Sequence, residues 1–413
     1  MFLMKKLRNN NFYFLEIIVL VLLYLVFLYI PYNWSYSKKV LHICGLVSLL
    51  CYLFSVQKRQ LHNVDKLLIL AIFIYGASFF IWGGIFGRFG GFYADHIDKA
   101  RVIVALSFIL LFVVNNQRKI PYTRLILFCG SSIFLCIIFL FAVYQKMFYP
   151  EINDSRVTFY LGLGATETAY IVSIFCLVAV NSAPKKFGLV GTMILFILSY
   201  ITILLTVTRS AVLFFPLLFL INLLMFTPNN KLVLKRFVLV FLCIAVLGGV
   251  FNKDKIMSRI DNTIDNINYF SSGVSSNTSE GLRLTMAIVG VNAGIDAPLG
   301  QSIESRKQIA MAMAQAAPFY EPVVDYLEQS HLHNEILENF SLRGVWGLAI
   351  LLFLYYAIFK AAFFYQNKLL FSIGTTSVVY GLTDVVLNGH LVMIFFPAII
   401  FAYVLNMARV DDK

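Results

Sequence analysis

The chain has 413 residues, of which 60% are hydrophobic and only 13% are charged, and its mean hydropathy is +0.81. Soluble domains carry about 25% charged residues, so this composition excludes an ordinary globular protein. The net charge of +12 could suggest a nucleic-acid partner. The basic residues lie mainly in short connections between apolar runs, however, which is the pattern that orients membrane proteins, and we expect no nucleic acid.

Twelve apolar runs divide the chain, and many are long enough to cross a bilayer core of about 30 Å. They fall near residues 12–30, 40–56, 66–84, 101–114, 124–144, 162–181, 187–206, 210–226, 235–251, 345–364, 369–387 and 391–408. The first run is longer than the apolar core of a secretory signal, and no small-residue cleavage site follows it, so we expect a retained span. The pattern predicts an all-α polytopic membrane protein with about twelve transmembrane helices.

The distribution of basic residues predicts the orientation of these spans. With a cytoplasmic N-terminus, the inside segments hold eighteen basic residues and the short outside segments hold eight. This asymmetry places both termini in the cytoplasm. Three parts result, which are spans 1–9 in residues 1–251, a long outer loop in residues 252–343, and spans 10–12 in residues 344–413.

The outer loop is too long for a connection without structure of its own. Isoleucines recur at helical spacing among polar residues between positions 256 and 267, which predicts an amphipathic helix on the membrane surface. Residues 304–316 are rich in alanine and methionine, and Pro318 follows them, which indicates a second helix. We expect a mostly helical subdomain that covers the membrane domain.

Several kinds of site are not indicated. All six cysteines lie in apolar runs, which favours packing roles over a disulfide or a thiolate metal site. The sequence contains no Walker loop, no GxGxxG and no internal repeat, so it lacks ATP-coupling machinery of its own.

Two arginines stand out near the predicted outer face. Arg209 interrupts an otherwise continuous apolar stretch, and Arg283 follows Gly281 in the outer loop. An arginine that snorkels to the interface, or one on a solvated helix, would explain each of them singly. Together, two guanidinium groups on one face suit a diphosphate.

A histidine and a carboxylate accompany these arginines. His333 has a side chain that can act as a general base near neutral pH, although a helix-capping or interfacial histidine is the alternative. Asp384, near the outer end of the eleventh predicted span, needs a partner there, and we expect it to orient His333 or to pair with an arginine. Glu167, near the outer end of the sixth span, is a weaker candidate. His331 and His333 lack the spacing and the cysteines of a zinc site, so we predict no metal.

These residues indicate a metal-independent transfer from a lipid diphosphate donor. The arginines would hold the diphosphate and the histidine would deprotonate an acceptor hydroxyl. Membrane transport is the alternative that the residues alone leave open.

Several short motifs carry a more specific resemblance. The run His333-Asn334-Glu335-Ile336-Leu337-Glu338, followed by Gly344 and Gly347, resembles the signature of the O-antigen ligase/polymerase superfamily. The closer similarity is to enterobacterial O-antigen ligases, over five motifs in matching order, which are Gly162-Leu163-Gly164-Ala165-Thr166, Thr208-Arg209-Ser210-Ala211, Gly281-Leu282-Arg283-Leu284, Ser305-Arg306 and His331-Leu332-His333-Asn334-Glu335. The order and spacing extend over nearly the whole chain.

The resemblance implies an inverting glycosyltransferase with a GT-C-type architecture in the Gram-negative inner membrane. Its partners would be the undecaprenyl diphosphate-linked O-antigen donor, the lipid A–core acceptor and membrane lipids. The active site would face the periplasm, and no cofactor would be needed.

The resemblance also implies roles for residues at matching positions. Arg209 and Arg283 would bind the diphosphate and stabilise the charge of the leaving group. His333 would be the base, supported by Asp384. His331, Glu167 and Arg306 are possible additional site residues.

Two other functions remain open at this point. An O-antigen polymerase shares the donor chemistry but accepts a second lipid-linked glycan. A lipid-linked oligosaccharide flippase or secondary transporter would instead place polar groups near the bilayer midplane and often shows inverted repeats, which this sequence lacks.

Overall fold

The computed structural model describes residues 17–27, 29, 34–54, 60–87, 92–116, 122–148, 156–158, 164–225, 234–239, 241–242, 253–273, 276–327 and 331–410. Within these ranges the regular elements are all helical, and no strand occurs. The bundle is built from α2 (Trp34–Phe54), α3 (Asn63–Phe86), α4 (Phe92–Asn116), α5 (Thr123–Phe148), α6 (Ala165–Ser182), α7 (Gly188–Thr206), α8 (Arg209–Leu224), α14 (Glu335–Phe364), α15 (Lys368–Gly381) and α16 (Val392–Val410). The remaining helices are α10 (Lys253–Ser271), α11 (Ser279–Asp296), α12 (Ile303–Ala316) and α13 (Glu321–Leu327).

Six of these helices are long and apolar enough to cross a membrane, namely α2, α3, α5, α6, α7 and α14. Three shorter apolar helices cover residues 17–27, 209–224 and 392–406. The all-α prediction is confirmed for the described residues, and the six candidate spans fit a polytopic membrane protein. The count of twelve spans stays a prediction, because most of the ninth expected run, near 235–251, lies outside the described residues.

Helix α6 passes through the centre of the bundle. Every residue from Thr168 to Ala179 is buried, and the helix packs against α5, α7, α8, α15 and α16. A helix that is apolar on all sides has no face suited to water, so its sequence fits this central position. The outer end of α6 carries two polar side chains of the candidate site, Glu167 and Tyr170.

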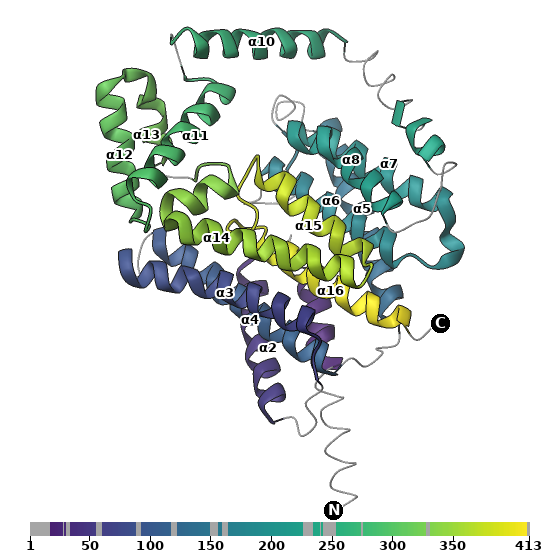
Figure 1. Ribbon diagram of the computed structural model, residues 1–413. Coiled ribbons are helices and arrows are strands. Elements are labelled where there is room, and N and C mark those ends of the chain that lie inside the picture. The colour runs from purple at the N-terminus through teal and green to yellow at the C-terminus, as the bar shows by residue number, and fades with distance from the viewer. Residues whose placement is uncertain are drawn as a thin grey trace, which may run out of the picture.

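Helices α11, α12 and α13 share a small apolar core of their own. It consists of the buried residues Met286, Val289, Ala310, Val323, Leu327 and Leu332. Helix α11 also packs on α14, which joins this group to the bundle (Figure 1). These helices fall in the segment 252–343, and the separate periplasmic subdomain predicted there stays a prediction.

Helix α10 confirms that the isoleucine-rich stretch is helical. It contacts α11, and Figure 1 draws it apart from the bundle, across one end of the molecule. Ile264 and Ile267 are about half exposed. The association of this helix with the membrane surface stays a prediction.

Helix α14 bends sharply at Gly344. This residue has φ 63° and ψ −154°, a conformation that only glycine adopts readily. The break leaves the N–H of Val345 free to donate to the carbonyl oxygen of Pro298 at 2.9 Å, in the turn after α11. The first turns of α14 are therefore fixed against α11 and the turn that follows it.

Replacing Gly344 with alanine tests this bend. The added Cβ would lie 2.1 Å from the Pro298 carbonyl oxygen, and the backbone conformation alone would cost about 1–3 kcal/mol. We expect Gly344→Ala to lower the melting temperature of the purified protein by several degrees or to prevent folding. Gly84→Ala on α3 is the control, because its Cβ meets no atom within 4 Å, and it should melt like the wild type. Equal melting temperatures for all three proteins would contradict this account of the bend.

Candidate functional site

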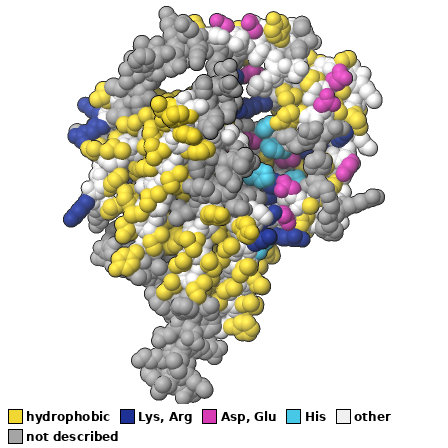
Figure 2. Space-filling model, turned by 180° about the vertical axis from the view of Figure 1, so that it is seen from behind, with side chains coloured by type: hydrophobic (Ala, Val, Ile, Leu, Met, Phe, Trp, Pro, Cys, Tyr) yellow, Lys and Arg dark blue, Asp and Glu magenta, His cyan; other side chains and the backbone are white. Residues whose placement is uncertain are grey.

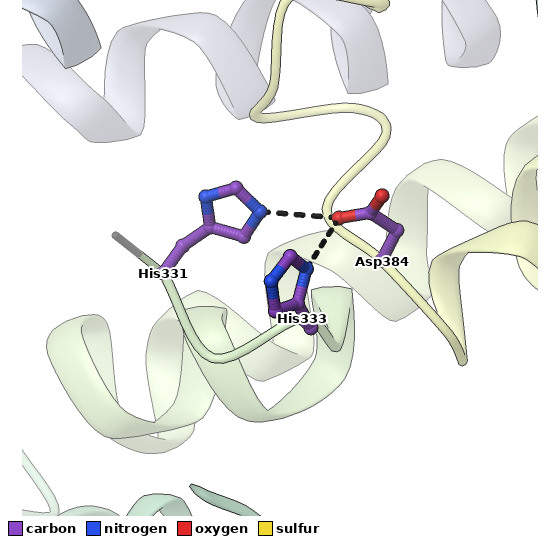
Figure 3. A group of neighbouring side chains, drawn as sticks. All are labelled: His331, His333 and Asp384. Carbon is purple, nitrogen blue, oxygen red and sulfur yellow. Dashed lines mark hydrogen bonds and ion pairs between the residues drawn. The ribbon is translucent and has the colours of Figure 1, made fainter. Parts of the chain in front are cut away.

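Two irregular segments meet at the first turn of α14 and bring His331, His333 and Asp384 together. Nε2 of His331 lies 3.1 Å from Oδ1 of Asp384, and Nδ1 of His333 lies 3.0 Å from the same oxygen (Figure 3). The N–H of Val385 also donates to that oxygen, at 2.8 Å. Both histidines therefore share one carboxylate oxygen. His333 is one of the two kinds of partner that the sequence suggested for Asp384, the other being an arginine, and the contact with His331 was not expected.

The position of Asp384 corrects one expectation. The apolar run predicted a helix that continues to residue 387, but α15 ends at Gly381, and Asp384 lies in the irregular connection to α16. The loop before α14 is irregular as well, and His333 adopts a left-handed φ of 48°. Asn334 joins the two segments, since its amide donates to the carbonyl oxygen of Leu382 at 3.1 Å while its side-chain oxygen caps α14.

The shared oxygen changes the protonation of its neighbours. Burial tends to raise the pKa of Asp384, but the hydrogen bonds from the two histidines and the positive charge of His331 outweigh it and hold that pKa well below its usual range. Burial likewise tends to lower the pKa of His331, yet the hydrogen bond and the charge of Asp384 raise it above 6.5. Asp384 is thus a carboxylate, and His331 gains positive charge near neutral pH.

The other ring nitrogen of His333 contacts a tyrosine. Nε2 of His333 is hydrogen-bonded to the hydroxyl of Tyr326, at the end of α13. If Nδ1–H donates to Asp384, as a carboxylate partner requires, Nε2 carries the lone pair and accepts from Tyr326. The arrangement therefore prepares Nε2 to accept a proton. The sequence did not indicate Tyr326 as a site residue, because its contact with His333 depends on how α13 packs next to the loop before α14.

The predicted arginines lie on neighbouring elements of the structure. Arg209 is the first residue of α8 and forms an ion pair with Glu280 in the first turn of α11. Arg283 follows Glu280 by one helical turn and is exposed. Asn266 of α10 also donates to Glu280, at 2.8 Å. The end of α8 that carries Arg209 therefore lies next to the turn of α11 that carries Arg283.

Tyr170 of α6 connects the arginine side of the site to the histidine side. Its hydroxyl lies 2.9 Å from Oγ of Ser210, next to Arg209, and 3.0 Å from Oγ1 of Thr383, next to Asp384. Its ring is buried and stacks on Tyr380 with ring centroids 3.9 Å apart. The central helix thus fixes the ends of α8 and α15 relative to each other.

The two remaining candidates have partners within the protein. Glu167 caps its own helix by accepting from the N–H of Gly164 at 2.9 Å, and it lies within the electrostatic influence of Asp384 and His331. Arg306 is buried and forms an ion pair with Glu338 at 2.9 Å. Arg306 therefore lies inside the protein next to the first turn of α14, and its side chain does not face solvent.

Lys99 is not among the residues that the sequence singles out. Its side chain is buried beside Asp95 on α4, and its charge acts on His331 and Glu167. The i,i+4 spacing of Asp95 and Lys99 was the only signal in the sequence. Figure 2 shows histidine, acidic and basic side chains gathered on one side of a face whose other side is broadly apolar.

The three central side chains also have donor atoms that a metal ion could use. The atoms of His331, His333 and Asp384 lie within 4.8 Å of one another. The sequence-based expectation of a metal-independent site stays a prediction.

The raised pKa of His331 predicts a pH-dependent contribution to stability. A group whose pKa is raised by folding stabilises the protein fully below its unfolded pKa, about 6.5, and loses that effect as the pH rises through the folded value. We expect the melting temperature of His331→Ala to fall below that of the wild type by more at pH 6 than at pH 9. As a control, both proteins also receive Asp384→Asn. The difference in melting temperature between them should then no longer be larger at pH 6 than at pH 9. A difference that is constant or grows from pH 6 to pH 9 would contradict the assignment.

Comparisons with known proteins agree with the motifs. Residues 194–352 match the family model described as O-antigen ligase. The chain is also 28% identical over 411 residues to a protein named O-antigen ligase from Escherichia coli strain K12, and the match covers 95% of this chain and 94% of that protein. The matched family region contains Arg209, Arg283, His331 and His333, and Asp384 joins them through the fold. Residues 194–352 are thus similar to the O-antigen ligase family and nearly the whole chain is similar to a protein named O-antigen ligase, which confirms the resemblance that the ordered motifs predicted.

Proposed function

We propose that this protein is an O-antigen ligase, an inverting, metal-independent glycosyltransferase. It moves O-antigen from undecaprenyl diphosphate to a sugar hydroxyl of lipid A–core. It works at the periplasmic face of the Gram-negative inner membrane, with a GT-C-type architecture, twelve spans and cytoplasmic termini. The observation that best supports this proposal is the pair of histidines on one carboxylate, with two arginines on neighbouring helices.

His333 is the base in this proposal. Its Nε2 takes the proton of the acceptor hydroxyl, whose oxygen takes the place that the hydroxyl of Tyr326 occupies in the structure. The acceptor oxygen bonds to the anomeric carbon of the donor sugar while the bond from that carbon to the phosphate oxygen breaks, which inverts the configuration. Asp384 stabilises the imidazolium that forms.

The arginines act on the leaving group. The diphosphate gains negative charge as the glycosidic bond breaks. A guanidinium group can bind a phosphate through two parallel hydrogen bonds. Arg283 is exposed and available to such a ligand, whereas Arg209 is paired with Glu280. A bound diphosphate would therefore compete with Glu280 for Arg209.

Complementation of a ligase-deficient Gram-negative strain tests the proposed function. We expect the wild type to restore capped lipopolysaccharide on a gel. His333→Ala, Arg209→Ala and Arg283→Ala, expressed to equal levels, should reduce capping by at least about 100-fold, because each removes a group that acts on the transition state.

The other outcomes separate the alternatives. If the wild type restores no capping but restores chain length in a polymerase-deficient strain, the protein is a polymerase. If it restores neither capping nor chain length but moves lipid-linked glycan across the membrane, it is a transporter. Full capping by all three variants would leave the ligase proposal standing and refute the residue roles.

A second prediction concerns the competition for Arg209. We expect Glu280→Gln to lower the KM for the undecaprenyl diphosphate-linked donor several-fold, because an amide competes poorly with a phosphate for a guanidinium group. The KM for lipid A–core should stay the same in a steady-state assay of the purified enzyme. Glu321→Gln, on the neighbouring helix α13, is the control and should change neither constant. An unchanged or higher donor KM for Glu280→Gln would show that Glu280 does not compete.

A further inference from the structure

The first turn of α14 carries two buried glutamates that take no part in the proposed reaction. Glu335 is 0% exposed and Glu338 is 1% exposed. Buried carboxylates are costly unless several donors satisfy their oxygens. Each of them accepts hydrogen bonds from one of the two segments that carry the site residues, among other donors. We call the loop before α14 (residues 331–334) the histidine arm and the connection between α15 and α16 (residues 382–391) the aspartate arm.

Glu338 binds the arm that carries the histidines. Its Oε2 accepts from the N–H of Leu332 at 3.0 Å, and Leu332 is the residue between His331 and His333. The same oxygen accepts from the guanidinium group of Arg306 at 2.9 Å, and that guanidinium group also donates to Oγ of Ser341. The ion pair thus fixes the peptide from which both imidazole rings project.

Glu335 binds the arm that carries the aspartate. Its Oε2 accepts from the N–H of Val386 at 2.7 Å and from the N–H of Leu387 at 2.8 Å, two and three residues after Asp384. Its Oε1 accepts from the hydroxyl of Tyr75 at 2.9 Å and from the amide of Asn339 at 3.2 Å. The four donors account for both oxygens of the carboxylate.

The two glutamates are three residues apart on one helix, so the helix sets the spacing between the two arms. Each loop is irregular and could not fix this spacing through its own backbone pattern. Catalytic groups must be held within about 0.5 Å of their productive positions, and misplacement by about 1 Å can cost about 100-fold in rate. A rigid helical turn with a carboxylate toward each arm meets that requirement.

We propose that Glu335 and Glu338, with Arg306, are positioning residues that set the geometry between His333 and Asp384. This inference rests on the proposed ligase function. It gives Arg306, which the resemblance named only as a possible additional site residue, the role of supporting the histidine arm. Loss of either anchor lowers kcat and leaves the donor KM unchanged, because the arginines that bind the donor are not moved.

The histidine arm is tested with two double variants that both lack the buried ion pair. Removing both charges avoids the instability of a single unpaired charge. Arg306→Met with Glu338→Leu removes the acceptor for the Leu332 N–H, whereas Arg306→Met with Glu338→Gln keeps an uncharged acceptor there. We expect the first variant to lose 10- to 100-fold in kcat and the second to recover most of it, with donor KM unchanged in both.

The aspartate arm is tested with Glu335→Leu and Tyr75→Phe. Leucine offers no acceptor to the N–H groups of Val386 and Leu387, which Oε2 of Glu335 accepts from in the wild type. We expect Glu335→Leu to lower kcat by at least about 10-fold. Tyr75→Phe removes one donor from Oε1 and leaves the backbone contacts of Oε2 intact, so its kcat should stay close to that of the wild type.

Three measurements distinguish failure of the anchors from failure of the ligase proposal. Steady-state transfer to lipid A–core is measured alongside the melting temperature and the NMR signals of ¹⁵N-labelled histidines. If the wild type transfers nothing, the ligase proposal fails, and the histidine signals still show whether the anchors fix the histidine–aspartate hydrogen bonds. If the wild type is active and the folded Leu-containing and Gln-containing double variants have equal kcat, the positioning role of Glu338 is wrong. Wild-type kcat for Glu335→Leu would refute the same role for Glu335.

Discussion

The geometry of the site depends on one carboxylate oxygen. Oδ1 of Asp384 forms hydrogen bonds with His331, His333 and the N–H of Val385. It therefore joins two irregular segments that are far apart in the sequence. Neither segment has a regular backbone pattern to fix its shape. In a mostly apolar protein, polar groups with no water nearby must find partners within the protein, and each such contact then restricts the fold strongly. The contacts around Asp384 therefore determine where a proton can be taken up.

The sequence predicted the helical class and the composition of the site better than the course of the backbone. Hydropathy is enough to predict helices, because a membrane excludes unpaired backbone groups and makes helices the simplest solution. It failed at residues 382–391, where Val385, Val386 and Leu387 continue the apolar run but are not helical. The N–H groups of Val386 and Leu387 are satisfied by Glu335, which is 51 and 52 positions earlier. No local pattern could reveal such a partner.

The same reason explains the candidates that sequence reasoning interpreted differently. The family resemblance gave Arg306 only as a possible additional site residue. Its partner, Glu338, is 32 positions away and equally buried, so only the fold shows that the two charges neutralise each other. Arg209 stands out in the sequence as a charge in an apolar stretch, but its pairing with Glu280 depends on how α11 lies against α8.

The contacts that join residues 252–343 to the bundle decide how this protein can be divided. Trp82 of α3 donates to the carbonyl oxygen of Gln301 at 2.9 Å, and Tyr93 of α4 donates to Glu304 at 2.6 Å. Glu335 of the same segment accepts from backbone groups beyond α15. The segment contributes the histidines, and the bundle contributes the aspartate. A chimera that exchanges this segment between two related proteins would therefore exchange the histidines of the candidate site without their aspartate, and it would not transplant an independent specificity module.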